Sequence, residues 1–338
     1  MKEADVVGAV LPLLEREHGG ARITIEGVRR MTGGSVRESW ALDATIARPG
    51  AASERRRLVF LVFRPGGHRI FGPREEFRLL AAAHAARVPV PSPLWQGDTA
   101  QGEPFCVMER IEGETVGRRI VRDDRFGRAR SALPAQLARA LAAIHRIPIG
   151  PDLVFLPAPP SDRETAEWEV ERIEELYRMV TPDPHPAFEL ALRWLAQHMP
   201  HDQARALVHG DFRIGNVIVN EEGLAAVLDW ELAHRGDPME DLGWLCVRSW
   251  RFGADHLPVG GVGTREALFE AYEAASGRWV DPARVRFWEI FGNLRWGVFT
   301  LVQTRFFLDG TSTSVELASI GRRAAETEWE LVRLLEES

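Results

Sequence analysis

The chain has 338 residues, of which 45% are hydrophobic and 27% are charged, and its formal net charge is −7. The length exceeds one ordinary core and predicts two lobes, while the composition is that of a globular protein and excludes a fibrous or unfolded chain. The negative charge argues against a nucleic-acid partner. All but one of the 42 basic residues are arginine. The exception is Lys2. Because the chain has no other lysine, any mechanism that needs a lysine inside the fold is excluded.

The first residues lack the pattern of a secretory signal, because they are acidic and lead into an amphipathic run that reaches Glu17. No stretch approaches the roughly 18 uninterrupted apolar residues that a membrane helix needs. We therefore expect a cytoplasmic protein without a membrane partner. Cys106 and Cys246 lie far apart in apolar segments, which predicts two buried thiols rather than a disulfide or a metal site.

The first third of the chain is predicted to form strands around one helix. Residues 22–30 and 38–46 are rich in strand formers and flank a glycine-bearing turn at 31–35. Residues 57–64 are nearly all apolar and should form a central strand. Residues 72–83 have the early proline, the acidic first turn and the apolar spacing of a helix.

The end of the first lobe is predicted from a change of pattern. The prolines within residues 88–93 require an extended segment, because each disfavours helix in the residue before it. Residues 104–111 then have the pattern of a buried strand, which ends at Glu112-Gly113-Glu114. We therefore predict a first lobe over residues 1–111, with the nucleotide-binding sheet and helix, and a second lobe over residues 112–338.

The second lobe is predicted to be mainly helical. A capping box at 161–164 opens one of its helices, and the expected helices cover residues 134–146, 161–180, 186–198, 264–276, 282–307 and 314–335. Strands interrupt them only within residues 206–231, where 217–219 and 225–228 flank a good hairpin turn. The fold class is therefore α+β.

The chemistry is predicted to lie in residues 207–231. Phosphoryl transfer needs a carboxylate that takes a proton from the acceptor hydroxyl and oxygen ligands for Mg²⁺. Asp211 would be the base, Asn216 and Asp229 would bind the metal, and Glu231 could reach a second ion through water. Aspartate and asparagine also favour turns, so each alone could be an ordinary loop residue. Their combination with a hairpin is far more specific.

This stretch resembles the aminoglycoside phosphotransferase and choline kinase-like family, small-molecule relatives of the protein kinases. His209-Gly210-Asp211 with Asn216 is similar to the family's His-Gly-Asp-x-x-x-x-Asn loop, and residues 228–231 are similar to its Asp-x-Glu metal segment. Residues 236–243 match its Asp-Pro-x-x-Asp-Leu segment. The resemblance implies a two-lobed protein-kinase-like fold, with a small antiparallel-sheet N-lobe carrying one main helix and a larger, mainly helical C-lobe. It also implies ATP and Mg²⁺ as cofactors.

Carried over by position, the resemblance assigns the nucleotide site to the first lobe. The turn at 31–35, with Gly33, Gly34 and Ser35, would cover the phosphates, although it could equally be a plain hairpin turn. Residues 108–111 would be the hinge that borders adenine, with Met108, Glu109 and Ile111 as its candidates. Met108 is as plausibly a core residue.

The family resemblance also puts a lysine on the third strand, paired with a glutamate on the following helix. Here Arg64 occupies the strand end, with Glu76 as its expected partner and Glu75 as the alternative. Either Arg64 carries the α- and β-phosphates or this interaction is absent, since arginine and lysine are not interchangeable. A surface salt bridge is the plainer interpretation.

Three residues near the loop are expected to have structural roles. The resemblance implies that Asp241 braces the backbone of the catalytic loop, and a helix cap is the alternative. His209 is expected to point inward and brace the loop. Asp237, which precedes a proline, is expected to shape a turn.

The acceptor is expected to be a small molecule with a hydroxyl group. Tryptophans at helical spacing are usually core, yet one helix also carries residues that could line a mixed apolar and cationic pocket: Asn293, Arg295, Trp296, Gln303 and Arg305. Such a pocket favours a hydroxy acid or a hydroxyacyl thioester over an aminoglycoside. The hypothesis is an ATP- and Mg²⁺-dependent phosphotransferase. The alternative is a catalytically weak nucleotide-binding regulatory protein on the same fold, which the missing lysine favours.

Overall fold

A computed structural model of the chain describes residues 1–31, 37–63, 70–201 and 205–337. The chain divides into two compact units. The first comprises Met1–Gly113, Gly150–Phe155 and Ala225–Glu231, and the second comprises Glu114–Ile149, Leu156–Leu224 and Leu232–Ser338.

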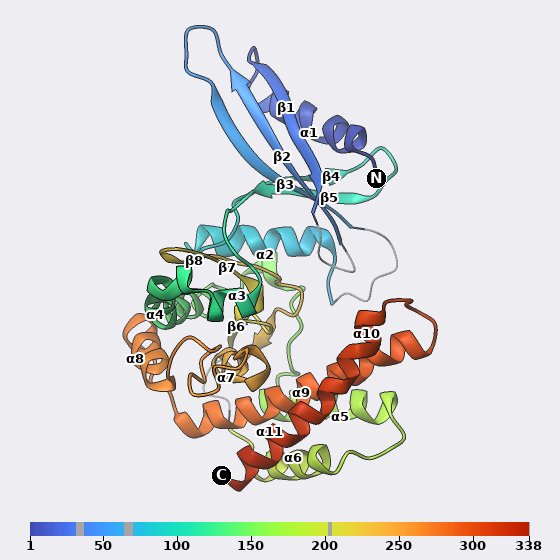
Figure 1. The fold of residues 1–338 in the computed structure, drawn as a ribbon, viewed down its shortest axis with the longest axis vertical. Helices are drawn as coiled ribbons and strands as arrows, with labels where there is room; N and C mark the ends of the chain where they lie inside the picture. The colour runs from blue at the N-terminus through green and yellow to red at the C-terminus, as the bar shows by residue number, and fades with distance from the viewer. Residues whose placement is uncertain (32–36, 64–69, 202–204, 338) are drawn as a thin grey trace. The chain divides into compact units, whose positions relative to one another are not determined.

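The first unit is built on an antiparallel sheet of five strands in the order β1-β2-β3-β5-β4 (Figure 1). The strands are β1 Arg22–Arg30, β2 Arg37–Ala47, β3 Glu54–Phe63, β4 Pro93–Asp98 and β5 Pro104–Glu109. Helix α2, Pro73–Ala85, follows β3. The central position predicted for residues 57–64 is confirmed over the described part, because β3 pairs with both β2 and β5.

Helix α1, Glu3–Glu17, supplies one side of the core of this unit. Val6, Val10 and Leu14 recur at helical spacing and are fully buried. They belong to the same apolar cluster as Trp40 on β2 and Phe60 on β3, which are register partners. An amphipathic helix on one sheet face is the expected way to bury both apolar surfaces.

The second unit is mainly helical, as predicted. Its helices are α3 Gly117–Arg122, α4 Gly127–Ile144, α5 Thr165–Val180, α6 Pro186–Gln197, α7 Met239–Cys246, α8 Arg265–Ser276, α9 Pro282–Leu308, α10 Val315–Ile320 and α11 Ala324–Glu336. Helix α9 packs against α7, α10 and α11 (Figure 1). It is buried on several faces over its first half, which explains why its apolar residues follow no single stripe.

Short strands within the helical region position the loop of interest. Strands β6, Ala206–Val208, and β9, His234–Gly236, pair antiparallel, and β7, Val217–Asn220, pairs with β8, Gly223–Val227. The carboxamide oxygen of Asn220 accepts hydrogen bonds from the backbone N–H groups of Glu222 and Gly223. The predicted hairpin turn is therefore confirmed.

Several predicted elements need correction. The prediction of a capping box at 161–164 was wrong, because α5 begins at Thr165 and the side chain of its N-cap residue Glu164 makes no capping hydrogen bond. The single helix predicted at 314–335 is two helices separated by a 3-10 turn at Gly321–Arg323. A Cβ at Gly321 would lie 2.0 Å from the Thr304 hydroxyl, so the chain at this turn lies close to α9. Strands β4 and β9 were not predicted.

Other expectations agree with the structure. The α+β fold class is confirmed by the antiparallel sheet of the first unit and the helices of the second. Cys106 and Cys246 are both buried free thiols. Among the described residues, no helix is both long and apolar enough to cross a membrane.

Candidate functional site

The loop predicted to be catalytic joins β6 to β7 and depends on a glycine at its start. Gly210 has φ +78°, a left-handed backbone conformation that glycine adopts without strain. A Cβ at this position would lie 2.3 Å from the backbone oxygen of Leu232. Only glycine therefore lets the loop turn this close to the segment that leads into β9.

A buried carboxylate holds the backbone of this loop. Asp241 on α7 accepts hydrogen bonds from the N–H groups of His209 (2.8 Å) and Gly210 (2.9 Å). Its Oδ2 also lies 3.1 Å from His145 Nε2, and His145 Nδ1 lies 2.8 Å from the Tyr272 hydroxyl. Burial opposes ionisation of Asp241, but the hydrogen bond and charge of His145 lower its pKa. The bracing role expected for Asp241 is confirmed by these contacts.

The other structural expectations can also be read from hydrogen bonds. Asp237 shapes the start of α7, because its side chain accepts from Met239 N at 3.0 Å and its backbone oxygen accepts from Glu240 N at 2.9 Å. His209 is fully buried, and its Nδ1 accepts from Asp211 N at 3.2 Å. Both residues thus have the structural roles that the sequence predicts.

A second brace comes from Arg295 on α9. Its Nη2 donates to the backbone oxygen of Gly210 at 2.5 Å, and its Nη1 donates to Glu240 Oε1 at 2.7 Å. The guanidinium lies 4.0 Å from the ring centroid of Trp244. Arg295 and Asn293 are both buried, and Arg295 supports the loop, while the acceptor pocket expected on this helix stays a prediction.

The Asp211 carboxylate is fixed by three side chains. Its Oδ1 accepts from Trp244 Nε1 at 2.8 Å and from Arg213 Nε at 3.0 Å, and its Oδ2 accepts from Asn216 Nδ2 at 2.5 Å. Each carboxylate oxygen can accept two hydrogen bonds. Among the donors that the structure describes, Oδ1 has two and Oδ2 has one. Oδ2 is therefore the atom with capacity for a hydroxyl proton.

The structure brings Asp211 and Asn216 together in the second unit, and assigns Asp229 and Glu231 to the first. Asp229 has φ +66°, a conformation that is uncommon outside glycine and that occurs often at functional sites. The amide oxygen of Asn216 and the Asp229 carboxylate are hard oxygen donors of the kind Mg²⁺ prefers. Among the described histidine, cysteine and acidic residues, no three form a metal site on their own.

The nucleotide-site candidates of the first unit are described only in part. Gly33, Gly34, Ser35 and Arg64 lie outside the described residues.

The hinge candidates lie at the end of β5 and just after it. Met108 and Glu109 close that strand and Ile111 follows it, while the N–H group of Glu109 donates to Ser92 O at 3.0 Å. Glu76 lies in the first turn of α2, beside Glu75, which pairs with Arg78 at 2.7 Å. The Arg64–Glu76 pair thus stays a prediction.

The chain matches a known family over most of its length. Residues 51–288 match the model of a phosphotransferase enzyme family, APH. Acyl-CoA dehydrogenase family member 10 of Mus musculus is 31% identical over 191 residues, which cover 54% of this chain and 17% of the mouse protein. The chain therefore spans less than a fifth of the length of that relative.

Solved structures with the same fold cover nearly the whole chain. A protein of Ralstonia eutropha JMP134 named as an aminoglycoside phosphotransferase has a TM-score of 0.70 and 24% identity, covering 96% of this chain and 98% of that one. A thermostable mutant of aminoglycoside phosphotransferase APH(4)-Ia, in ternary complex with AMP-PNP and hygromycin B, has a TM-score of 0.58 and 18% identity, covering 96% and 98%. These likenesses confirm the predicted kinase-like fold.

Proposed function

Because the chain belongs to the phosphotransferase enzyme family, we propose that it transfers the γ-phosphoryl group of ATP to a hydroxyl of a small molecule, with Mg²⁺ as the metal. The observation that carries the proposal is the geometry of the Asp211 carboxylate. Three donors orient it, and a loop braced by Asp241 and Arg295 supports it. Positioning and electrostatics supply most of the catalysis in phosphoryl transfer, so a rigid carboxylate suits the reaction.

In this proposal each predicted residue has one task. Asp211 orients the acceptor hydroxyl and takes its proton at Oδ2. Asn216, whose Nδ2 is held by Asp211, would use its amide oxygen for the metal, together with Asp229, and Glu231 would act through water. When bound, Mg²⁺ supplies charge neutralisation at the phosphates. The first lobe would bind the nucleotide through the turn at 31–35, Arg64 with Glu76, and the hinge at 108–111.

The acceptor in this proposal is anionic, a hydroxy acid or a hydroxyacyl thioester. Arg213 supports this choice, because its guanidinium reaches Asp211 at 3.0 Å while the side chain stays about a quarter exposed. A cation beside the base would attract an acceptor with a carboxylate or phosphate. The name of the mouse relative points to acyl-CoA chemistry, in which acyl groups are carried as thioesters.

A catalytically weak nucleotide-binding regulator is the second candidate. One observation favours it: the single lysine of the chain is Lys2, so no lysine stands on the third strand. In this case the protein would bind Mg²⁺–nucleotide without turnover. Both candidates predict binding of Mg²⁺–nucleotide, but only the phosphotransferase predicts turnover.

Calorimetry tests nucleotide binding, and a turnover assay tests phosphoryl transfer. The protein is titrated with AMP-PNP or a GTP analogue, with and without Mg²⁺, and is then assayed with ATP and a panel of hydroxy acids, hydroxyacyl-CoA thioesters and aminoglycosides. We expect Mg²⁺-dependent binding that Asp229→Asn weakens. Asp211→Asn should keep binding but reduce turnover by about 10²–10⁴-fold, the range for a lost general base.

Asp309→Asn is the matched control, because Asp309 is an exposed residue at the end of α9 that pairs with Arg305. It should behave like the wild-type protein. Binding without turnover on any acceptor would favour the regulator, and normal turnover by Asp211→Asn would refute the assignment of the base.

A further inference from the structure

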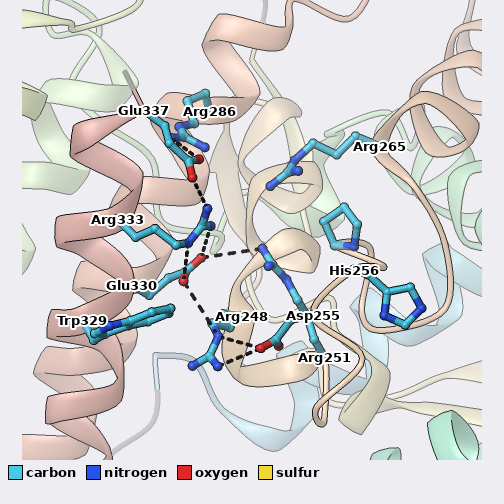
Figure 2. A pocket seen from close by; sticks show the side chains of 11 residues that line it. Arg248, Arg251, Asp255, His256, Arg265, Arg286, Trp329, Glu330, Arg333 and Glu337 are labelled. Atoms are coloured by element: carbon cyan, nitrogen blue, oxygen red, sulfur yellow. Dashed lines mark hydrogen bonds and ion pairs between the residues drawn. The ribbon is translucent and has the colours of Figure 1, made fainter.

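The second unit contains a cavity of about 370 Å³ whose lining is rich in arginine. Figure 2 shows its side chains, which come from α9, α11, the start of α8 and the segment after α7. Among the described residues, five arginines line it: Arg248, Arg251, Arg265, Arg286 and Arg333. Neither Asp211 nor Asn216 lines it, so it is a different site from the one already described.

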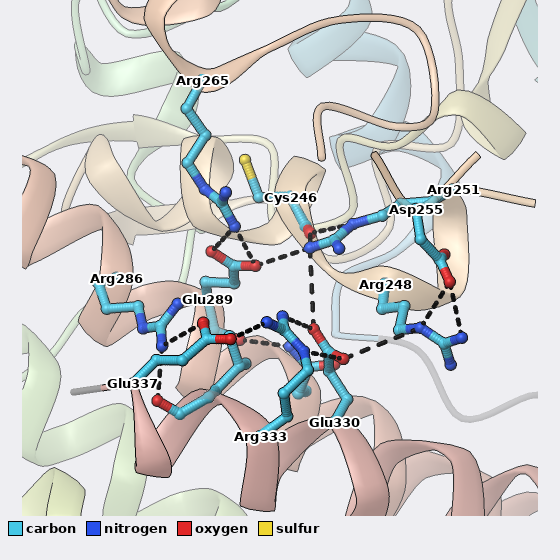
Figure 3. A network of polar contacts seen from close by, with 12 residues as sticks. Cys246, Arg248, Arg251, Asp255, Arg265, Arg286, Glu289, Glu330, Arg333 and Glu337 are labelled. Carbon is cyan, nitrogen blue, oxygen red and sulfur yellow. Dashed lines mark hydrogen bonds and ion pairs between the residues drawn. The ribbon is translucent and has the colours of Figure 1, made fainter. Parts of the chain in front are cut away.

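Two of the four carboxylates that pair with these arginines, Glu289 and Glu330, are buried, whereas Asp255 and Glu337 are exposed. Glu289 is fully buried between Arg251 (2.9 Å) and Arg265 (2.7 Å) (Figure 3). Glu330 is also buried, and it accepts hydrogen bonds from Arg333 at 2.7 and 3.0 Å. Arg248 approaches Glu330 at 3.8 Å and donates to the exposed Asp255 at 2.7 Å.

The guanidinium groups are more accessible than their buried partners. The side chains of Arg248, Arg265 and Arg333 are each about a third exposed, and that of Arg286 about a quarter. Arginine presents five N–H donors, and pairing with a carboxylate engages only some of them. The cavity therefore presents mainly hydrogen-bond donors and positive charge.

The charge balance of the lining also favours an anion. Five arginines and three acids, Asp255, Glu330 and Glu337, line the cavity, and the buried Glu289 pairs with two of these arginines, which leaves a formal excess of one positive charge. The chain as a whole has a formal net charge of −7, so this excess is local. Bringing so many guanidinium groups together costs electrostatic energy that a bound anion would offset.

We propose that this cavity is a binding site for a small molecule with a phosphomonoester group. A phosphomonoester carries close to two negative charges at neutral pH and presents three acceptor oxygens, so its charge complements the positive excess and its oxygens suit the array of donors. Arginine binds such groups through two parallel N–H donors, and the fork geometry favours phosphate over a simple point charge. The cavity lies within the size range of small-molecule sites.

Trp329 adds a surface for the rest of the ligand. Its side chain lines the cavity and is 56% exposed, which is unusual for a tryptophan. The guanidinium of Arg248 lies 4.8 Å from its ring centroid, so the aromatic face and the phosphate donors adjoin. A ligand whose phosphate meets Arg248 could pack its organic part on this ring.

Calorimetric titration of the full chain tests the proposal. Inorganic phosphate, O-phosphoserine and succinate are compared at equal ionic strength. We expect both phosphates to bind and succinate, a dianion of different geometry, to bind at least about tenfold more weakly. Arg248→Gln and Arg286→Gln should each weaken phosphate binding about tenfold, as expected for the loss of one charge-assisted hydrogen bond.

Two control proteins separate this site from others. Arg178→Gln removes an arginine of α5 that pairs with Glu174 at 3.0 Å and does not line the cavity, and it should bind phosphate normally. Arg163→Gln should also bind normally, because Arg163 pairs with Glu167 and does not line the cavity. Absence of phosphate binding, equal binding of succinate, or unchanged affinity in both cavity variants would overturn the proposal.

A measurement on the wild-type protein avoids any effect of substitution on folding. Phenylglyoxal modifies accessible arginines, and mass spectrometry locates the adducts. Phosphate should slow modification of Arg248, Arg286 and Arg333 several-fold and leave Arg178 unaffected. Equal rates at all four arginines with and without phosphate would contradict the site. A separate experiment tests whether the protein binds vesicles that contain phosphatidic acid. If it binds them and free phosphate releases it, the phosphomonoester is the headgroup of a lipid.

Discussion

The carboxylate of Asp211 is oriented by side chains that the loop alone does not supply. Arg213 and Asn216 are its neighbours in sequence, but Trp244 comes from α7, more than thirty residues later. The indole N–H of Trp244 donates to Oδ1, while the Trp244 ring packs on Arg295, which holds the Gly210 oxygen. A single tryptophan therefore connects the proposed base with the brace beneath its loop.

We predict that Trp244→Phe lowers kcat about tenfold or more and changes KM for the nucleotide little. The substitution keeps an aromatic ring on Arg295 but removes one buried hydrogen bond to a charged group, worth roughly 1.5–3 kcal/mol, and about 1.4 kcal/mol corresponds to tenfold in rate. Oδ1 would keep Arg213 as its donor, so Asp211 would lose orientation rather than charge. Steady-state kinetics measure both constants.

Trp288→Phe is the matched control for this prediction. Trp288 is an equally buried tryptophan whose indole N–H donates to a carboxylate, that of Asp237, at 2.6 Å. Its indole N–H thus donates to Asp237 and not to Asp211. We expect it to lose stability while its kcat stays near that of the wild-type protein. An equal loss of kcat in both variants would assign the effect of Trp244 to general packing.

At the scale of elements, β9, α5 and α7 meet around one buried histidine. His234 Nε2 on β9 lies 2.9 Å from Glu240 on α7 and 3.9 Å from Glu169 on α5. Burial alone would lower the histidine pKa, but the two carboxylates outweigh it and raise the pKa to about 9. Burial raises the pKa of Glu169, whereas His234 helps to lower that of Glu240. The histidine is thus charged at neutral pH and joins three elements.

This cluster predicts a loss of stability at alkaline pH. A histidine whose folded pKa is raised contributes fully below its unfolded pKa of about 6.5, and the contribution is lost as pH rises through about 9. The raised pKa of Glu169 also makes stability fall with rising pH, over the range just above the ordinary pKa of a glutamate. Between pH 7 and 9.5 the free energy of unfolding should fall, by on the order of 3 kcal/mol at most.

Urea denaturation across this pH range measures the effect, with His234→Gln as the comparison. The variant should be less stable at neutral pH and should show a flatter dependence on pH. Wild-type stability that is constant or rises from pH 7 to 9.5 would contradict the prediction, as would equal slopes in the two proteins.

The elements that sequence predicted well have long, regular patterns. The spacing of apolar residues located α2, α6, α8 and α9 to within a few residues, because burial of one face decides such helices. Strand β9 has only three residues and exists through its pairing with β6, so no local pattern marks it. The turn at Gly321 likewise lies against Thr304, a contact that the local sequence does not predict.

The same limit applies to the site. Asp211 and Asn216 are five residues apart in a recognisable motif, and the structure joins them by a hydrogen bond. Trp244 and Arg295 were not predicted as their supports, because their contacts with the loop span 33 and 85 residues. Arg213 stands inside the motif, and its position two residues after Asp211 was the available signal for its role.

At the scale of the whole molecule, arginine replaces lysine as the internal cation. The only lysine, Lys2, immediately precedes α1 and is not part of the sheet. If the protein binds the phosphates of ATP with a side-chain cation at the predicted end of the third strand, that cation is Arg64. Arginine would hold two phosphate oxygens through its planar fork, where lysine offers a point charge. The proposed nucleotide site therefore predicts that the nucleotide KM depends on Arg64 and not on Lys2.

We predict that Arg64→Ala raises the nucleotide KM about tenfold or more, the effect of losing charge-assisted hydrogen bonds to phosphate. Acetylation of Lys2 and the N-terminal amine should leave the nucleotide KM unchanged. Arg57→Ala is the matched control, because Arg57 lies on β3 and pairs at 3.4 Å with Glu112, which is exposed. If Arg64→Ala and Arg57→Ala both keep the wild-type KM, Arg64 forms only a surface salt bridge, and the phosphates are bound without a cation from this strand.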